Sequence, residues 1–93
     1  MKSISLLMSN TDNKLSQQQW HDFIATTKHE VRSACTEFHF LGAPPNWEDH
    51  QNAAFVFTLE DQAITALKEK MKSLRRAYKQ DSVAWLEGDT IFL

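Results

Sequence analysis

Basic side chains recur along one stretch of the chain at a spacing that could bind phosphate groups. They stand four, three and four residues apart, which places them on one face of a helix. Ammonium and guanidinium groups arranged in this way can contact nucleic-acid phosphates without reading the base sequence. A solvated helix face is also often rich in lysine, and basic residues near a helix C-terminus interact favourably with the helix dipole. The four residues that could contact nucleic acid are Lys68, Lys72, Arg75 and Lys79.

The charge of the chain is unevenly distributed, and its overall sign weakens the nucleic-acid hypothesis. The 93 residues carry a net charge of −2. Residues 64–80 hold six basic groups and one acidic group, whereas residues 1–63 hold four basic and eight acidic groups. The sequence contains neither a Gly-rich phosphate loop nor the aromatic motif of RNA-binding sheets. Nucleic acid is therefore an alternative partner but not the favoured one.

His39 is the weak catalytic candidate, as a general acid or base. It lies between Phe38 and Phe40 in a stretch where polar and apolar residues alternate, so we expect it on the open face of a strand. A catalytic histidine needs a cleft and a pKa suited to its task. The same alternation is typical of any half-solvated strand. The sequence therefore favours a protein that is not an enzyme, with catalysis by His39 as a further alternative.

The histidines and carboxylates do not show the spacing of a metal site. His21 and His29 are eight residues apart, about 80° around a helix, whereas metal ligands on one helix usually stand three or four residues apart. Residues 48–50 are adjacent and their side chains point apart. Cys35 follows a predicted helix, whose dipole raises a thiol pKa, so we expect it to pack rather than to react. We expect no metal and no cofactor.

Two amphipathic helices must position these residues. The first begins at Ser16, where Gln19 completes a capping box and Leu15 and Trp20 occupy hydrophobic-staple positions. The second begins at Asp61, or earlier if residue 58 is the cap. Both show apolar residues at helical spacing, and these stripes must be buried. The stripes comprise Trp20, Phe23, Ile24, Thr27, Val31, Ala34 and Cys35 in the first helix, and Ile64, Leu67, Met71, Leu74 and Tyr78 in the second.

Short apolar or alternating segments predict strands at residues 3–9, 36–41, 53–58 and 82–86. Pro44 and Pro45 break the second of these. Gly88 and Asp89 are expected to form a tight turn, so that residues 90–93 complete a short C-terminal hairpin. This order predicts an α+β protein with a ferredoxin-like βαββαβ antiparallel sheet and two helices on one face.

Length and composition predict a single domain over residues 1–93. No apolar run approaches the roughly 20 residues that span a bilayer, so no membrane association is expected. The lone cysteine and the lack of a visible signal peptide favour a cytoplasmic location.

Apolar residues on the uncovered sheet face favour self-association. Leu41, Ala84, Leu86 and Ile91 could lie there together, and an open apolar face on a small sheet is usually covered. Trp47 beside the two prolines either folds back onto the core or meets a partner. The first hypothesis is therefore a small interaction or regulatory module, a homodimer or a partner of another protein, with Trp47, Leu86 and Ile91 as contacts. The alternatives are a nucleic-acid-binding accessory protein and a small dimeric enzyme with a site on the open sheet face.

Overall fold

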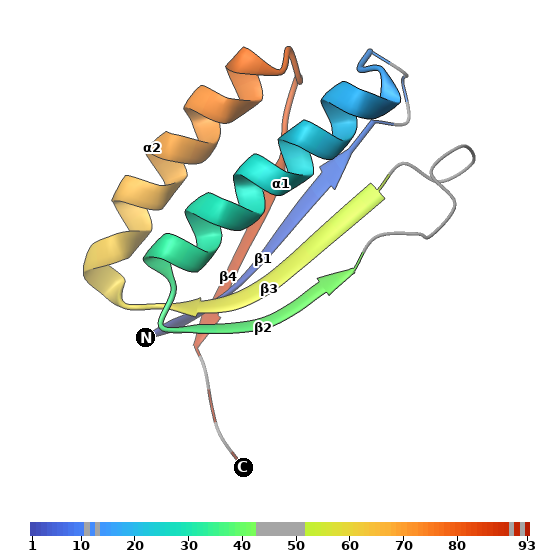
Figure 1. Ribbon diagram of the computed structural model, residues 1–93. Coiled ribbons are helices and arrows are strands. Elements are labelled where there is room, and N and C mark those ends of the chain that lie inside the picture. The colour runs from blue at the N-terminus through green and yellow to red at the C-terminus, as the bar shows by residue number, and fades with distance from the viewer. Residues whose placement is uncertain (11, 13, 43–51, 90, 92) are drawn as a thin grey trace.

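The described residues form four strands and two helices that follow one another in the order βαββαβ (Figure 1). The computed structural model describes residues 1–10, 12, 14–42, 52–89, 91 and 93. The α+β class, the antiparallel sheet and the two helices are confirmed. The elements are β1 (Lys2–Ser9), α1 (Gln17–Ala34), β2 (Glu37–Gly42), β3 (Asn52–Leu59), α2 (Asp61–Ala77) and β4 (Ala84–Asp89).

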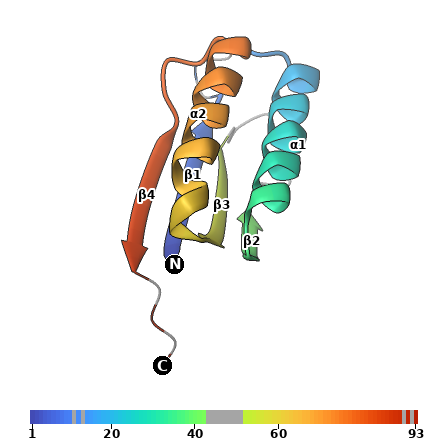
Figure 2. The ribbon, with the colours of Figure 1, turned by 90° about the vertical axis from the view of Figure 1, so that its left-hand side faces the viewer.

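The sheet has the strand order β2-β3-β1-β4, and every neighbouring pair is antiparallel. β1 and β3 lie in the centre, where Leu6 pairs with Phe55 and Ile4 with Phe57. Both helices lie over the same face of this sheet, and no described helix or strand covers the other face (Figures 1 and 2). No helix in the described part of the chain is long and apolar enough to cross a membrane.

The core lies between the helices and the sheet, and its side chains come from alternate strand positions. Along β1, the buried side chains Ile4, Leu6 and Met8 alternate with residues that face the open side. Phe23 of α1 stacks on Tyr78 at the end of α2, with 4.7 Å between the ring centroids. The apolar stripes predicted for the helices point into this core. Its buried members on the helices are Trp20, Phe23, Ile24, Val31, Leu67 and Met71.

The start of α1 is confirmed in atomic detail. Ser16 is the N-cap residue: its hydroxyl accepts from the main-chain N–H of Gln19, and the Gln19 side chain accepts from the N–H of Ser16. Leu15 and Trp20 are both buried, as expected for a hydrophobic staple. The second helix begins at Asp61 after Glu60, so the earlier cap at Thr58 is wrong.

The prediction that Phe38 and Phe40 share one face of β2 is wrong because the strand contains a bulge. Phe38 pairs with Phe57 and Phe40 pairs with Val56, so His39 is the extra residue between two consecutive positions of β3. An extra residue shifts the alternation by one position. Phe40 therefore faces the open side, and Leu41, which pairs with Phe55, faces the helices.

The C-terminal hairpin is also wrong. Gly88 and Asp89 continue β4, where they pair with Ser3 and Lys2 of β1. A tight turn at these two residues would end this pairing, and an ion pair between Lys2 and Asp89 at 2.5 Å further holds the strand. The strand predicted for residues 90–93 includes two positions outside the described residues.

Candidate functional site

The open face of the sheet presents a continuous apolar and uncharged surface across all four strands. In one row, Phe40 of β2 is followed by Val56 of β3, Ser5 of β1 and Leu86 of β4. We call this surface the open face. Its next row consists of Gly42, Ala54, Leu7 and Ala84.

Large side chains on the open face are exposed to solvent. Phe40, Leu86 and Leu7 retain 54, 52 and 43% of their accessible surface. The remaining large apolar side chains of comparable exposure among the described residues belong to Met1, Ile91 and Leu93 at the chain ends. The open face is therefore the place where exposed apolar surface is concentrated within the folded elements.

Phe40 is held against the sheet by a glycine. A Cβ atom on Gly42 would collide with the ring of Phe40, so the ring lies over the bare main chain of this residue. Any side chain at position 42 would displace the ring. Gly42 therefore leaves room for the exposed ring of Phe40 against the main chain of β2.

The residues predicted to meet a partner lie at different places in the structure. Ala84 and Leu86 lie on the open face, and Leu41 does not. Ile91 follows β4 and is 76% exposed. Trp47 lies outside the described residues, as does the acidic and histidine-containing run at residues 48–50.

His39 occupies the bulge of β2 and contacts a carboxylate, but its contacts are those of a structural residue. Its Nε2 atom is 2.8 Å from the hydroxyl of Thr58 and 3.8 Å from Oε2 of Glu37. Thr58 is buried, so the imidazole satisfies a hydroxyl that would otherwise lack this partner.

Cys35 is the C-cap residue of α1, and burial raises the pKa of its thiol. The direction agrees with the prediction, but the main cause is desolvation and not the helix dipole. Among the described residues, no three His, Cys, Asp or Glu side chains are close enough to hold a metal ion.

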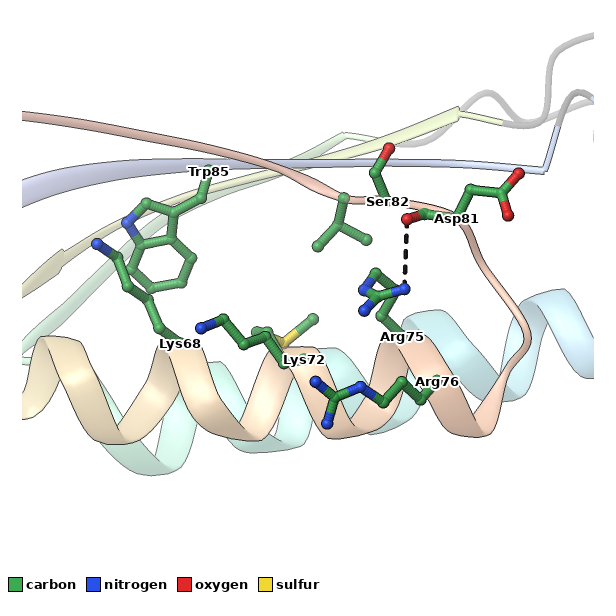
Figure 3. Close-up of a pocket in the computed structure, with 9 residues that line it drawn as sticks. Lys68, Lys72, Arg75, Arg76, Asp81, Ser82 and Trp85 are labelled. Carbon is green, nitrogen blue, oxygen red and sulfur yellow. Dashed lines mark hydrogen bonds between the residues drawn. The ribbon is translucent and has the colours of Figure 1, made fainter.

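A pocket of about 400 Å³ lies between α2 and the segment that leads into β4 (Figure 3). We call it the basic pocket. α2 supplies four cationic side chains and a methionine, and the opposite wall comes from residues 81–85. The lining residues are Lys68, Met71, Lys72, Arg75, Arg76, Asp81, Ser82, Val83 and Trp85.

Three of the four basic residues singled out in the sequence line this pocket, and one does not. Lys68, Lys72 and Arg75 contribute to it. Lys79 lies beyond the end of α2, in a left-handed conformation with φ of 56°, and Arg76 takes its place in the lining. The sequence places Arg76 beside this stripe as a further basic residue, and its spacing of four residues from Lys72 agrees with its position in the lining.

Comparison of the sequence with known family models found no match, and comparison with curated proteins found no matching relative. The function is therefore inferred from the residues of this chain.

Proposed function

We propose that the protein is a small ferredoxin-like interaction module that forms a homodimer by packing the open faces of two sheets against each other. The βαββαβ element order and the strand order β2-β3-β1-β4 support the ferredoxin-like assignment. The single cysteine supports a cytoplasmic location. The observation that carries the proposal is the exposure of Phe40, Leu86 and Leu7 on one uncovered face.

Burial of exposed apolar surface in a dimer interface contributes a favourable free energy of about 25 cal/mol for each Å² removed from water. The face offers three large side chains and a flat surround of small residues, so a second sheet can approach closely. The central rows described above contain no charged residue. In a twofold dimer each residue meets the same surface on the other copy, so central rows without charge avoid repulsion between like groups; the exposed Glu37, which pairs with Thr58, lies beside these rows on the edge strand β2.

The size of the face predicts a dimer that dissociates on dilution. Strands of six to eight residues in a four-stranded sheet give a footprint of about 400 Å², taking about 3.3 Å per residue and about 4.8 Å between strands. A standard stable interface buries roughly 800 Å² on each partner. The open face is smaller than this, which favours a reversible dimer over an obligate one.

Sedimentation velocity over a wide dilution series tests this proposal. We expect the wild-type chain to move from about 10.8 kDa towards twice that mass as its concentration rises. Leu86→Asp places a carboxylate in the centre of the interface and should keep the chain monomeric. The matched control is Leu93→Asp, the same change at a fully exposed position outside the strands, which should leave the association unchanged.

A second variant tests whether a loss of association comes from a folding defect. Ser5→Glu adds a charge on the open face at a position that already faces solvent in the monomer, next to Leu86. Both Leu86→Asp and Ser5→Glu should retain the wild-type circular dichroism spectrum. A wild-type chain that stays monomeric at every concentration, or a dimer that survives both substitutions, would contradict the proposal.

A further inference from the structure

The basic pocket lies on the helix-covered side of the sheet, away from the open face, and carries more positive charge than its own carboxylates neutralise. Asp81 is its acidic lining residue, and the carboxylate of Asp81 already pairs with Lys14 at 2.9 Å. Lys68 pairs with Glu87 at 2.6 Å, and Lys72 pairs with the exposed Glu69 at 3.1 Å. The other two cationic groups of the lining are the guanidinium groups of Arg75 and Arg76.

Neither Arg75 nor Arg76 forms an ion pair within the described residues, although the charge of Arg75 contributes to the lowered pKa of the Asp81 carboxyl. The Nη1 atom of Arg75 donates to the main-chain oxygens of Gln80 at 2.9 Å and Asp81 at 3.2 Å. These acceptors are neutral, so they fix the orientation of the guanidinium and leave its charge available. The Arg76 side chain has no hydrogen bond or ion pair to any residue that the structure describes.

The wall opposite the arginines combines the polar residues Asp81 and Ser82 with an apolar part, Val83 and Trp85. The indole of Trp85 lies near Lys68 (Figure 3), whose Nζ atom is 5.7 Å from the ring centroid. Two contacts hold the indole of Trp85 in place. The ring packs edge-to-face against Phe57, and its Nε1 atom donates to the carboxylate of Glu87 at 2.8 Å. The pocket therefore combines a cationic wall with an apolar surface suited to a flat organic group.

We propose that the basic pocket binds a small organic phosphate of the nucleotide class. The phosphate lies between Arg75, Arg76 and Lys72, and the apolar body of the ligand lies against Val83 and Trp85. A phosphate monoester carries close to two negative charges at neutral pH and accepts the paired N–H groups of a guanidinium. A pocket of about 400 Å³ is within the range that takes a small molecule.

Two observations favour a small phosphate over a long nucleic acid. The four cationic side chains of α2 line one pocket that a second chain segment closes on the other side, and Lys79 is not part of it. Glu69 and Glu87 lie beside Lys72 and Lys68, so carboxylates interrupt the positive surface that a polyanion would need to follow.

The test is a titration of isotope-labelled protein followed by NMR, with the indole N–H of Trp85 as the reporter. The probes are adenosine 5′-monophosphate, inorganic phosphate, adenosine and a short single-stranded oligonucleotide. We expect adenosine monophosphate to shift the Trp85 signal in a saturable manner, inorganic phosphate to bind more weakly, and adenosine to leave the signal in place. A Trp85→Phe variant assigns the reporter signal.

Matched variants separate the pocket from general attraction to a basic surface. Arg76→Gln removes a charge without disturbing the main-chain contacts of Arg75, and we expect it to weaken binding of adenosine monophosphate at least about tenfold. Lys79→Gln removes the same charge close by on the chain but outside the pocket, and we expect a change of less than about twofold.

Each other outcome would overturn the proposal. Equal losses in the two variants would indicate a diffuse electrostatic effect. An oligonucleotide that binds more tightly than adenosine monophosphate, with a steep dependence on salt, would identify an extended nucleic-acid surface instead. A Trp85 signal that none of the phosphate probes moves at millimolar concentration would show that the pocket does not bind phosphates.

Discussion

Asn10 joins the end of β1 to the start of α1 and is completely buried. Its Oδ1 atom accepts from the main-chain N–H of Leu15, and its Nδ2 atom donates to the main-chain oxygen of the same residue, both at 3.0 Å. Nothing in the sequence marks this contact, because a buried asparagine cannot be distinguished from an exposed one by its neighbours. The contact is with a residue five positions away, and it exists only once the loop has closed.

Replacing Asn10 by alanine should lower the free energy of unfolding by about 2–4 kcal/mol, because it leaves a buried N–H and a buried carbonyl without these partners. Urea denaturation at neutral pH measures the change. Asn52→Ala is the matched control: Asn52 is exposed at the start of β3, and its loss should cost less than about 0.5 kcal/mol. Equal costs at the two positions would rule out the Leu15 hydrogen bonds as the cause.

His39 shows a second limit of residue-by-residue reasoning. The alternation around it predicted the correct side for His39, whose imidazole meets Thr58, and for Phe38. It failed at Phe40 and Leu41, because a bulge is set by the pairing of two strands and leaves no mark in the local pattern. The alternation therefore assigns Phe40 to the core, although Phe40 lies on the open face.

At the scale of elements, the end of α2 closes with a pair of main-chain hydrogen bonds that usually require glycine. The N–H of Lys79 donates to the carbonyl of Arg76 at 3.0 Å, and the N–H of Gln80 donates to that of Arg75 at 2.9 Å. This is a Schellman motif with Lys79 in the left-handed position. A lysine gives no sequence signal for it, so the residue was placed on the helical face with Lys72 and Arg75.

Lys79→Gly should therefore raise the free energy of unfolding by about 0.5–1 kcal/mol, since glycine adopts this conformation without steric cost. Thermal and urea denaturation measure it. The same substitution at Lys70, inside α2 and exposed, should lower stability by about 1 kcal/mol. Effects of the same sign at both positions would contradict the conformational explanation.

The helices could be predicted well from the sequence, whereas the basic pocket could be predicted only in part. The stripe of α2 and its cations are local features that repeat along one segment. The opposite wall, with Val83 and Trp85, comes from the segment before and within β4, and its position depends on the pairing of β4 with β1. Leu86 was assigned to the open face by alternation along β4, a local rule that the bulge in β2 does not affect.

At the scale of the whole molecule, three ion pairs attach the C-terminal segment to the rest of the chain. Lys14 pairs with Asp81, Lys68 with Glu87, and Lys2 with Asp89. In each case the hydrogen bond from the lysine is the main cause of a carboxyl pKa below its ordinary value. The pKa of Glu87 is lowered further by the indole of Trp85.

The direction of these shifts predicts how stability depends on acid. Because folding lowers the carboxyl pKa values, the ion pairs contribute fully above the ordinary values of 3.8 for Asp and 4.5 for Glu. Their contribution is lost as the pH falls through the lower values of the folded chain. We expect the melting temperature to fall below pH 4.5 and to do so less steeply in a Lys14→Met, Lys68→Met double variant.

Lys28→Met is the control for this titration, because the Lys28 side chain makes no ion pair with the residues that the structure describes. It should leave the slope of melting temperature against pH unchanged. A double variant with the wild-type slope would show that the Lys14–Asp81 and Lys68–Glu87 contacts do not govern acid stability.

The alternation of β4 has a consequence for regulation. Trp85 faces the basic pocket and its neighbour Leu86 faces the opposite side of the sheet. The proposed phosphate binding and the proposed self-association would therefore share one strand, and thermodynamics requires any coupling between them to be reciprocal. The affinity for adenosine monophosphate of the wild-type chain at high concentration, compared with that of Leu86→Asp, gives the coupling free energy directly. A coupling free energy of zero would mean that the two surfaces are independent. Any other value would mean that each surface affects the other, with β4 as the strand that they share.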